Sequence, residues 1–124
     1  MTTSFSSELQ TAATVISTAR DMVNTAVATL KSNGGPDVQQ VLAYDIAHIS
    51  AAVETAASLL DYGAKGDQEA QITCAFAADM VHDFATRLVG REKLWGVSAA
   101  QLSMAAEFIE RLQKRRRPIP EILQ

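Results

Sequence analysis

The fold is decided by residues 9–36, LQTAATVISTARDMVNTAVATLKSNGGP. Apolar side chains recur there at alternating spacings of three and four residues, the pattern of a helix that packs in a bundle. These positions are Leu9, Ala12, Ile16, Ala19, Val23, Ala26 and Leu30. The run ends at Asn33-Gly34-Gly35-Pro36, because glycine accepts the left-handed backbone of a helix end and proline cannot continue a helix. The stretch therefore predicts a helix over residues 6–32.

Two further runs repeat the same spacing. The first predicts a helix over residues 36–62, and the second predicts a helix over residues 67–89 that reaches residue 94 if Gly90 does not interrupt it. The expected core positions are Leu42, Ile46, Ile49, Val53, Ala56 and Leu60, then Ala70, Cys74, Ala77, Val81, Phe84 and Leu88. The short turn at residues 63–66 predicts that these two helices lie antiparallel.

A fourth helix is predicted from its starting signal. Ser98 and Gln101 have the spacing of a capping box, and Val97 and Leu102 that of a hydrophobic staple. Its expected core positions are Leu102, Ala105, Ile109 and Leu112. Pro118 ends the helical part. The predicted fold is all-α, an up-down-up-down four-helix bundle over residues 1–117 with a C-terminal tail at residues 118–124.

Composition narrows the class of protein. The chain has 124 residues, a net charge of -3 and one cysteine, which favours one cytoplasmic domain without a disulfide and argues against nucleic-acid binding. Neither a signal peptide nor an apolar run of about 20 residues is apparent, so we expect a soluble protein with no membrane partner. The basic run Arg111 to Arg117 has three readings: a solvated helix end, a phosphate contact or a charged linker.

A doubled Asp-x-x-His pattern is the sharpest candidate for chemistry. Asp45 and His48 lie one turn apart on one predicted helix, and Asp79 and His82 repeat the spacing on the next. Ferritin-like bundles hold two metals with carboxylate-x-x-His pairs. However, both histidines lie roughly 120° from the centre of their apolar seams at about 100° per residue, whereas metal ligands point inward. Solvated or interhelical polar contacts are the favoured interpretation.

His48 and Cys74 are candidates for two other kinds of chemistry. A His-based phosphotransfer role for His48 lacks the lysine that usually follows such a histidine. Cys74 lies on an apolar seam, where a thiol is a small inert hydrophobe. The chain also lacks nucleotide-binding and nucleophile-elbow motifs. We therefore assign no catalytic, cofactor-binding or metal residue, and expect no catalysis by this chain on its own.

A second apolar stripe suggests association. Ile72, Phe76 and Met80 are spaced by four residues and lie outside the predicted seam. Further apolar residues outside the seams are Val15, Met22, Met104 and Phe108. A contiguous exposed apolar patch usually marks an interface. The stripe predicts a homo-oligomer or a partner interface, and a broad internal face is the alternative.

Five short stretches between Val41 and Val97 resemble a known family. They are residues 42–48 (LAYDIAH), 59–66 (LLDYGAKG), 74–79 (CAFAAD), 87–92 (RLVGRE) and 95–97 (WGV). Together they resemble the helical N-terminal extension of bacterial acyl-CoA dehydrogenases of the (2S)-methylsuccinyl-CoA dehydrogenase type. In that family the extension precedes a portion that binds FAD and carries the catalytic carboxylate. The resemblance implies no functional residue here, and FAD would belong only to a partner.

Three hypotheses follow. The first is a non-catalytic helical domain or subunit that accompanies an acyl-CoA dehydrogenase flavoprotein and aids oligomerisation or partner association. The second is a free-standing homo-oligomeric helical binding protein. The third is a phosphotransfer or metal-binding bundle that uses His48 or His82.

Overall fold

The described residues of the computed structural model, 6–103, 106–108 and 110, are almost entirely helical and contain no strand, which confirms the all-α class. The elements are α1 (Ser6–Ser32), α2 (Gly35–Val38), α3 (Gln40–Gly63), α4 (Asp67–Leu88), α5 (Glu92–Trp95) and the 3-10 helix η1 (Ala99–Leu102). Helical backbone also occurs at residues 103, 106–108 and 110. The predicted tail and the basic run Arg111 to Arg117 lie outside the described residues.

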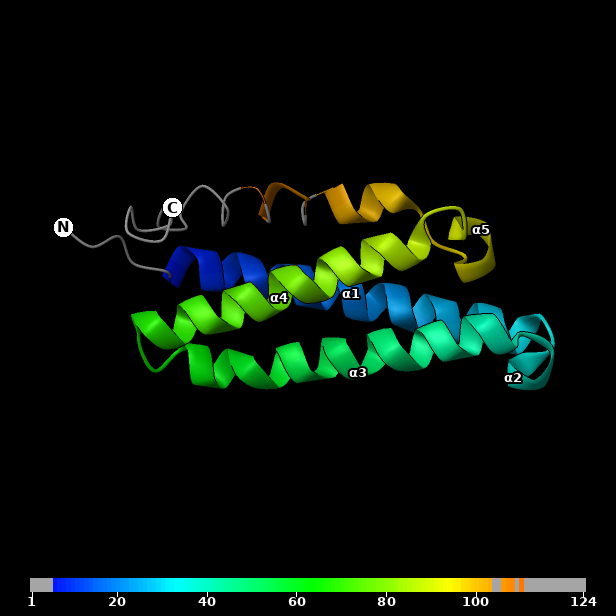
Figure 1. Cartoon of the computed structure of the whole chain (residues 1–124), viewed down its shortest axis with the longest axis horizontal. Helices are drawn as coiled ribbons and strands as arrows, with labels where there is room; N and C mark the ends of the chain where they lie inside the picture. Colours follow the sequence, from blue (N-terminus) through cyan, green and yellow to red (C-terminus); the bar gives the residue numbers. More distant parts are fainter. Residues whose placement is uncertain (1–5, 104–105, 109, 111–124) are drawn as a thin grey trace, which may run out of the picture.

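Three long helices form the body of the molecule. Helices α1, α3 and α4 lie side by side along its long axis (Figure 1), and each contacts the other two. The chain then turns at α5, and η1 contacts both α1 and α4. The 3-10 helix η1 therefore lies against α1 and α4, on the side of the molecule away from α3 (Figure 1).

The core consists of the residues that the apolar spacing selects. Leu9 and Leu60 are partly buried, and every other seam position predicted for the three long helices is buried. The buried hydrophobic residues of these helices are Ala12, Val15, Ile16, Ala19, Met22, Val23, Ala26, Leu30, Leu42, Ile46, Ile49, Val53, Ala56, Ala70, Cys74, Ala77, Met80, Val81, Phe84 and Leu88. One contiguous cluster joins most of them with Trp95 and Phe108.

The core is wider than the seams. Val15, Met22, Met80 and Phe108 are buried, although the sequence left open whether residues outside the seams would be exposed. A helix that packs between two neighbours buries an apolar face of at least about 100°, wider than a strict coiled-coil seam. The alternative of a broad internal face thus holds for these four residues.

The connection after α1 differs from the predicted one. Helix α1 ends at Ser32, as expected, and Gly34 has a φ of 106° that glycine adopts without strain. The helix predicted from residue 36 is divided, because Gln39 has φ -110° and ψ 61°, outside the helical region. Its Nε2 donates to the Asn33 carbonyl oxygen over 3.4 Å. A separate turn, α2, therefore precedes α3.

The connection after α4 also differs from a single long helix. Helix α4 ends at Leu88, and Gly90 has a φ of 77°, so the extension to residue 94 is replaced by a turn and α5. Gly96 has a φ of 75°, and a Cβ at this position would collide with Thr29 Oγ1 of α1. Only glycine fits this close approach, which folds the chain back onto α1.

The predicted capping box is confirmed. Ser98 Oγ accepts a hydrogen bond from the backbone N–H of Ala100 over 3.2 Å, and Gln101 Oε1 accepts from the backbone N–H of Ser98 over 2.9 Å. The helix begins here as the 3-10 turn η1. The side chain of Leu102, the expected staple partner of Val97, lies outside the described residues.

Candidate functional site: a buried carboxylate between two arginines

Asp45 is the buried charged residue that joins α3 to the end of α4. Its side chain is 6% exposed, although it belongs to a helix with a solvent-facing side. Its position on the helix explains this burial, because Asp45 directly precedes the core residue Ile46 and follows the core residue Leu42 by three positions. It therefore lies at the edge of the apolar face of α3, turned toward α4.

Two guanidinium groups neutralise this carboxylate. Arg87 Nη1 donates to Asp45 Oδ1 over 2.9 Å, and Arg91 Nη1 donates to Asp45 Oδ2 over 2.5 Å. Arg87 comes from the last turn of α4, and Arg91 from the residue that precedes α5. Arg87 Nε also binds Asp83, one turn earlier on α4, over 3.2 Å. We call Asp45, Asp83, Arg87 and Arg91 the Asp45 cluster.

The turn between α3 and α4 sets the register of this cluster. Near the turn, Thr73 Oγ1 of α4 donates to the Leu59 carbonyl oxygen of α3 over 3.0 Å. Antiparallel helices keep this register along their length, so Asp45 faces Arg87 about four turns further from the loop. The cluster thus fixes the end of the α3–α4 hairpin that lies far from its turn.

The electrostatics of the cluster favour a structural role. Burial disfavours the charged Arg87 guanidinium, but its hydrogen bonds to Asp83 and Asp45 outweigh this effect and raise the pKa of Arg87 above its ordinary value. Arginine then carries its charge throughout the physiological range and cannot act as a general acid. Both oxygens of Asp45 accept charge-assisted hydrogen bonds from arginine side chains, which are stronger than hydrogen bonds between neutral groups.

An Asp45→Asn chain is expected to unfold at lower urea concentration than the unmodified chain. The change removes the carboxylate that pairs with Arg91 and one of the two carboxylates that pair with Arg87. Breaking a fully buried pair costs about 3–5 kcal/mol, but the Arg87 and Arg91 side chains are 24% and 45% exposed and can recover some hydration. We expect a loss of about 2 kcal/mol.

The matched control is Glu54→Gln. Glu54 forms an ion pair with Arg20 over 2.6 Å, but both side chains are exposed, at 57% and 45%. The hydrogen bond from Arg20 lowers the pKa of Glu54, yet water screens an exposed pair and little stability depends on it. Equal urea midpoints for Asp45→Asn and the unmodified chain would contradict the proposed role of the Asp45 charge.

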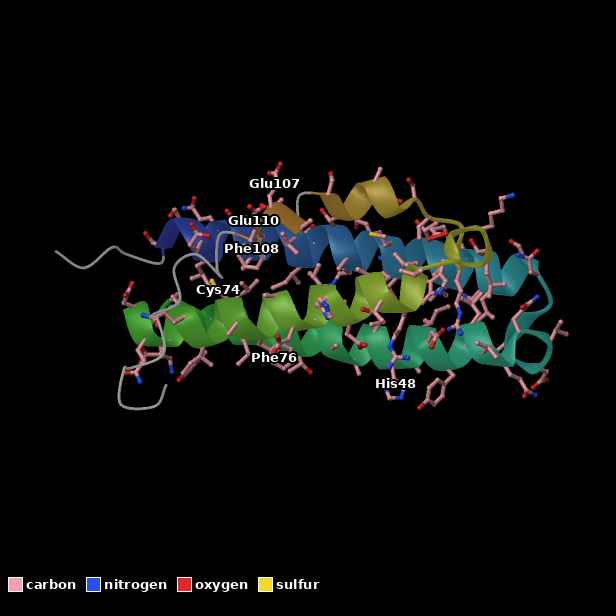
Figure 2. All side chains as sticks on the ribbon, turned by 45° about the horizontal axis from the view of Figure 1, so that its top comes forward. His48, Cys74, Phe76, Glu107, Phe108 and Glu110 are labelled. Atoms are coloured by element: carbon pink, nitrogen blue, oxygen red, sulfur yellow. The ribbon has the colours of Figure 1, made fainter. Side chains whose placement is uncertain are left out.

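The structure separates the members of the doubled Asp-x-x-His pattern. Asp45 enters the cluster, whereas His48, Asp79 and His82 are exposed. Figure 2 shows His48 on the outer side of α3, where its ring lies 4.5 Å from the ring of Tyr44. Among the described residues no three His, Cys, Asp or Glu side chains converge as metal ligands would. The pattern corresponds to one interhelical ion cluster and to exposed polar side chains.

The remaining sequence candidates divide between core and surface. Cys74 is fully buried, as predicted for a seam position, and belongs to the same core cluster as Phe108 (both are labelled in Figure 2). Of the proposed interface stripe, Ile72 is 47% exposed and Phe76 is partly buried against the core. Met80 is 3% exposed, so its assignment to an exposed stripe is corrected: its side chain belongs to the buried core cluster. The stripe is therefore shorter than expected.

Arg87, Arg91 and Trp95 were not selected as site residues from the sequence. The signal for the two arginines was present, since they lie one turn apart at the end of a helix whose antiparallel neighbour carries Asp45. Trp95 is fully buried, and its ring lies 5.2 Å from the ring of Phe84. These residues anchor the segment after α4, which periodicity alone does not place.

Comparison with known proteins found no family model, no curated protein and no solved structure that matches this chain. None of the described helices combines the length and the apolar character that a membrane crossing requires.

Proposed function

We propose that this chain is a non-catalytic helical domain or subunit that associates with a flavin-dependent acyl-CoA dehydrogenase and aids its assembly. In this proposal the segment from η1 onward completes an up-down-up-down four-helix bundle. FAD and the catalytic base belong to the dehydrogenase. The bundle supplies a surface, and its charged groups serve its own stability.

The Asp45 cluster is the observation that carries this proposal. Asp45 belongs to the first of the stretches that resemble the dehydrogenase extension, and Arg87 and Arg91 belong to the fourth. These stretches are far apart in sequence, yet their charged residues bind one another directly. Two of the stretches that resemble the family are therefore joined by ion pairs with a structural role. This supports common ancestry with the family rather than chance similarity among alanine-rich helices.

A pull-down from the native cell tests this function. Tagged chain is expected to retain a yellow flavoprotein, recognised by its flavin absorbance and identified as an acyl-CoA dehydrogenase by mass spectrometry. The control is the tagged Val81→Asp chain, in which a charge in the core should abolish the folded surface.

The unmodified chain and the Val81→Asp chain together distinguish three outcomes of the pull-down. Retention of the dehydrogenase by the unmodified chain but not by the Val81→Asp chain supports a folded accessory domain. Equal retention by both chains indicates unspecific adsorption. A colourless eluate without a dehydrogenase counts against the proposal and favours the second candidate, a free-standing homo-oligomeric binding protein.

One observation favours that second candidate. The outer side of α3 carries exposed apolar side chains, among them Val41 at 58% and Tyr44 at 62% exposure. Such a surface suits association whether or not a dehydrogenase is the partner. The phosphotransfer and metal hypotheses gain no comparable support, since His48 on α3 and His82 on α4 are both exposed.

A further inference from the structure

A short segment around α5 lies at the end of the three-helix body far from the α3–α4 turn (Figure 1). Helix α5 contacts α1, and its Trp95 ring packs against the ring of Phe84 on α4. Arg91, which directly precedes α5, pairs with Asp45 of α3. The segment is therefore attached to all three long helices. We call residues 91–96 the clasp.

The backbone of the clasp is hydrogen-bonded mainly to itself. The N–H of Trp95 donates to the Arg91 carbonyl oxygen over 3.1 Å. The N–H of Gly96 donates to the Glu92 carbonyl oxygen over 2.9 Å. Among the described residues, one backbone hydrogen bond joins the clasp to α4, from the N–H of Arg91 to the Leu88 carbonyl oxygen over 2.8 Å. The clasp can therefore move as a unit without exposing many unpaired backbone groups.

The two ends of the clasp have the character of hinges. Val89 is 76% exposed and has extended backbone, with φ -56° and ψ 117°. Gly90 follows with a φ of 77°, and no neighbouring group lies within 4 Å of the position that a Cβ would occupy there. Gly96, at the other end, has a φ of 75°. Hinges are a few loop or element-terminal residues, often small, that absorb the change in backbone angles.

The two arginines of the Asp45 cluster differ in how firmly they are held. Arg87 binds both Asp45 and Asp83 and is the more buried of the two. Arg91 binds Asp45, and its side chain is half-exposed. If Arg91 departs, Asp45 keeps its ion pair with Arg87, and the Arg91 guanidinium gains water. Release of Arg91 thus leaves no buried charge unpaired, which is the usual penalty for breaking such a pair.

Trp95 carries a group that opposes the closed position. Its side chain is fully buried, yet within the described part of the chain Nε1–H has no hydrogen-bond acceptor. A buried donor without an acceptor costs free energy, whereas an exposed indole N–H binds water. Burial of the indole ring favours the closed position, and the unpaired N–H works against it.

We propose that the clasp swings away from the body on Val89 and Gly90 while α1, α3 and α4 stay packed, and that the Asp45–Arg91 ion pair is the latch that holds it closed. In the closed form Trp95 covers Phe84, and in the open form both rings meet water. This inference goes beyond the function proposed above, because it concerns a movement of the chain on its own.

The first test is hydrogen exchange of the Trp95 indole N–H, followed by NMR on the purified chain. Trp95 is the only tryptophan, so its indole resonance is unambiguous. The backbone amides of Ile49 and Val81, in α3 and α4, report on the body. Relative to the intrinsic rates, we expect the indole to exchange about tenfold or more faster than these amides. Its exchange should also depend little on urea, because local opening exposes little surface.

The second test removes the latch with Arg91→Ala. We expect the indole exchange to accelerate about tenfold, because a hydrogen bond between charged groups is lost. The exchange of the Ile49 and Val81 amides should stay unchanged, which shows that the body remains folded. The control is Lys93→Ala, which removes the same charge from an exposed position of α5 and should leave the indole exchange unaltered.

Two results would overturn the proposal. Equal exchange and equal urea dependence for the indole and the body amides would mean that the clasp opens only when the whole chain unfolds. An Arg91→Ala chain whose indole exchange is unchanged, or changes no more than that of the body amides or of the Lys93→Ala chain, would mean that the ion pair is no latch. Both tests use the isolated chain, so their outcome is independent of the dehydrogenase pull-down.

Discussion

A Val81→Asp chain is expected to lose its cooperative fold. Val81 lies on α4 and is 1% exposed, within the single core cluster. An unpaired carboxylate at such a site costs about 3–5 kcal/mol, and loss of the buried valine side chain adds about 1.5–3 kcal/mol. The sum is comparable to the total stability of an average domain, about 5–15 kcal/mol.

Circular dichroism during thermal unfolding measures this effect. The control is Gln71→Asp, which introduces the same side chain at an exposed position of the same helix and should melt cooperatively. A cooperative transition of the Val81→Asp chain near that of the unmodified chain would show that α4 buries a different side than the one described here.

The core could be predicted because helix period and burial are directly linked. Leu42, Ile49 and Val53 were expected to share a side of their helix, and all three are buried. The end of α1 at Ser32 and the capping box at Ser98 were predictable for a similar reason, since both depend on side chains within a few residues. Local chemistry of this kind is fully present in the sequence.

The features that could not be predicted depend on how the helices pack against one another. Met80 lies off the strict seam of α4, yet it is 3% exposed within the core cluster, because neighbouring elements cover more of α4 than its seam. Likewise the break at Gln39 separates α2 from α3 although no proline or glycine occupies that position. Periodicity defines the centre of a buried side, and the packing of neighbouring helices defines its width.

The candidate site was predictable in part. Asp45 was selected for its spacing from His48, but it binds Arg87 and Arg91, which follow it by more than forty residues. Its partners follow from the antiparallel register, which the short turn at residues 63–66 indicates to within about one helical turn. That precision is insufficient to pair individual side chains, because neighbouring side chains of one helix face different directions.

Trp95→Ala is expected to be the second most damaging change, with a loss of about 3–5 kcal/mol. Trp95 is fully buried, packs against Phe84, and anchors the turn between α4 and η1. Removing the indole leaves a large cavity at the point where the chain folds back onto α1, which α5 contacts. The urea midpoint of unfolding, followed by circular dichroism, measures the loss.

Trp95→Phe is the informative companion, because it separates packing from hydrogen bonding. Within the described part of the chain the buried Trp95 Nε1–H has no hydrogen-bond acceptor. A buried donor without an acceptor costs about 1–3 kcal/mol, so phenylalanine loses some packing area but also removes this penalty. We therefore expect Trp95→Phe to retain at least about 2 kcal/mol of the stability that Trp95→Ala loses. Equal losses for both variants would mean that the indole N–H makes a hydrogen bond essential to the fold, and that shape alone does not anchor this turn.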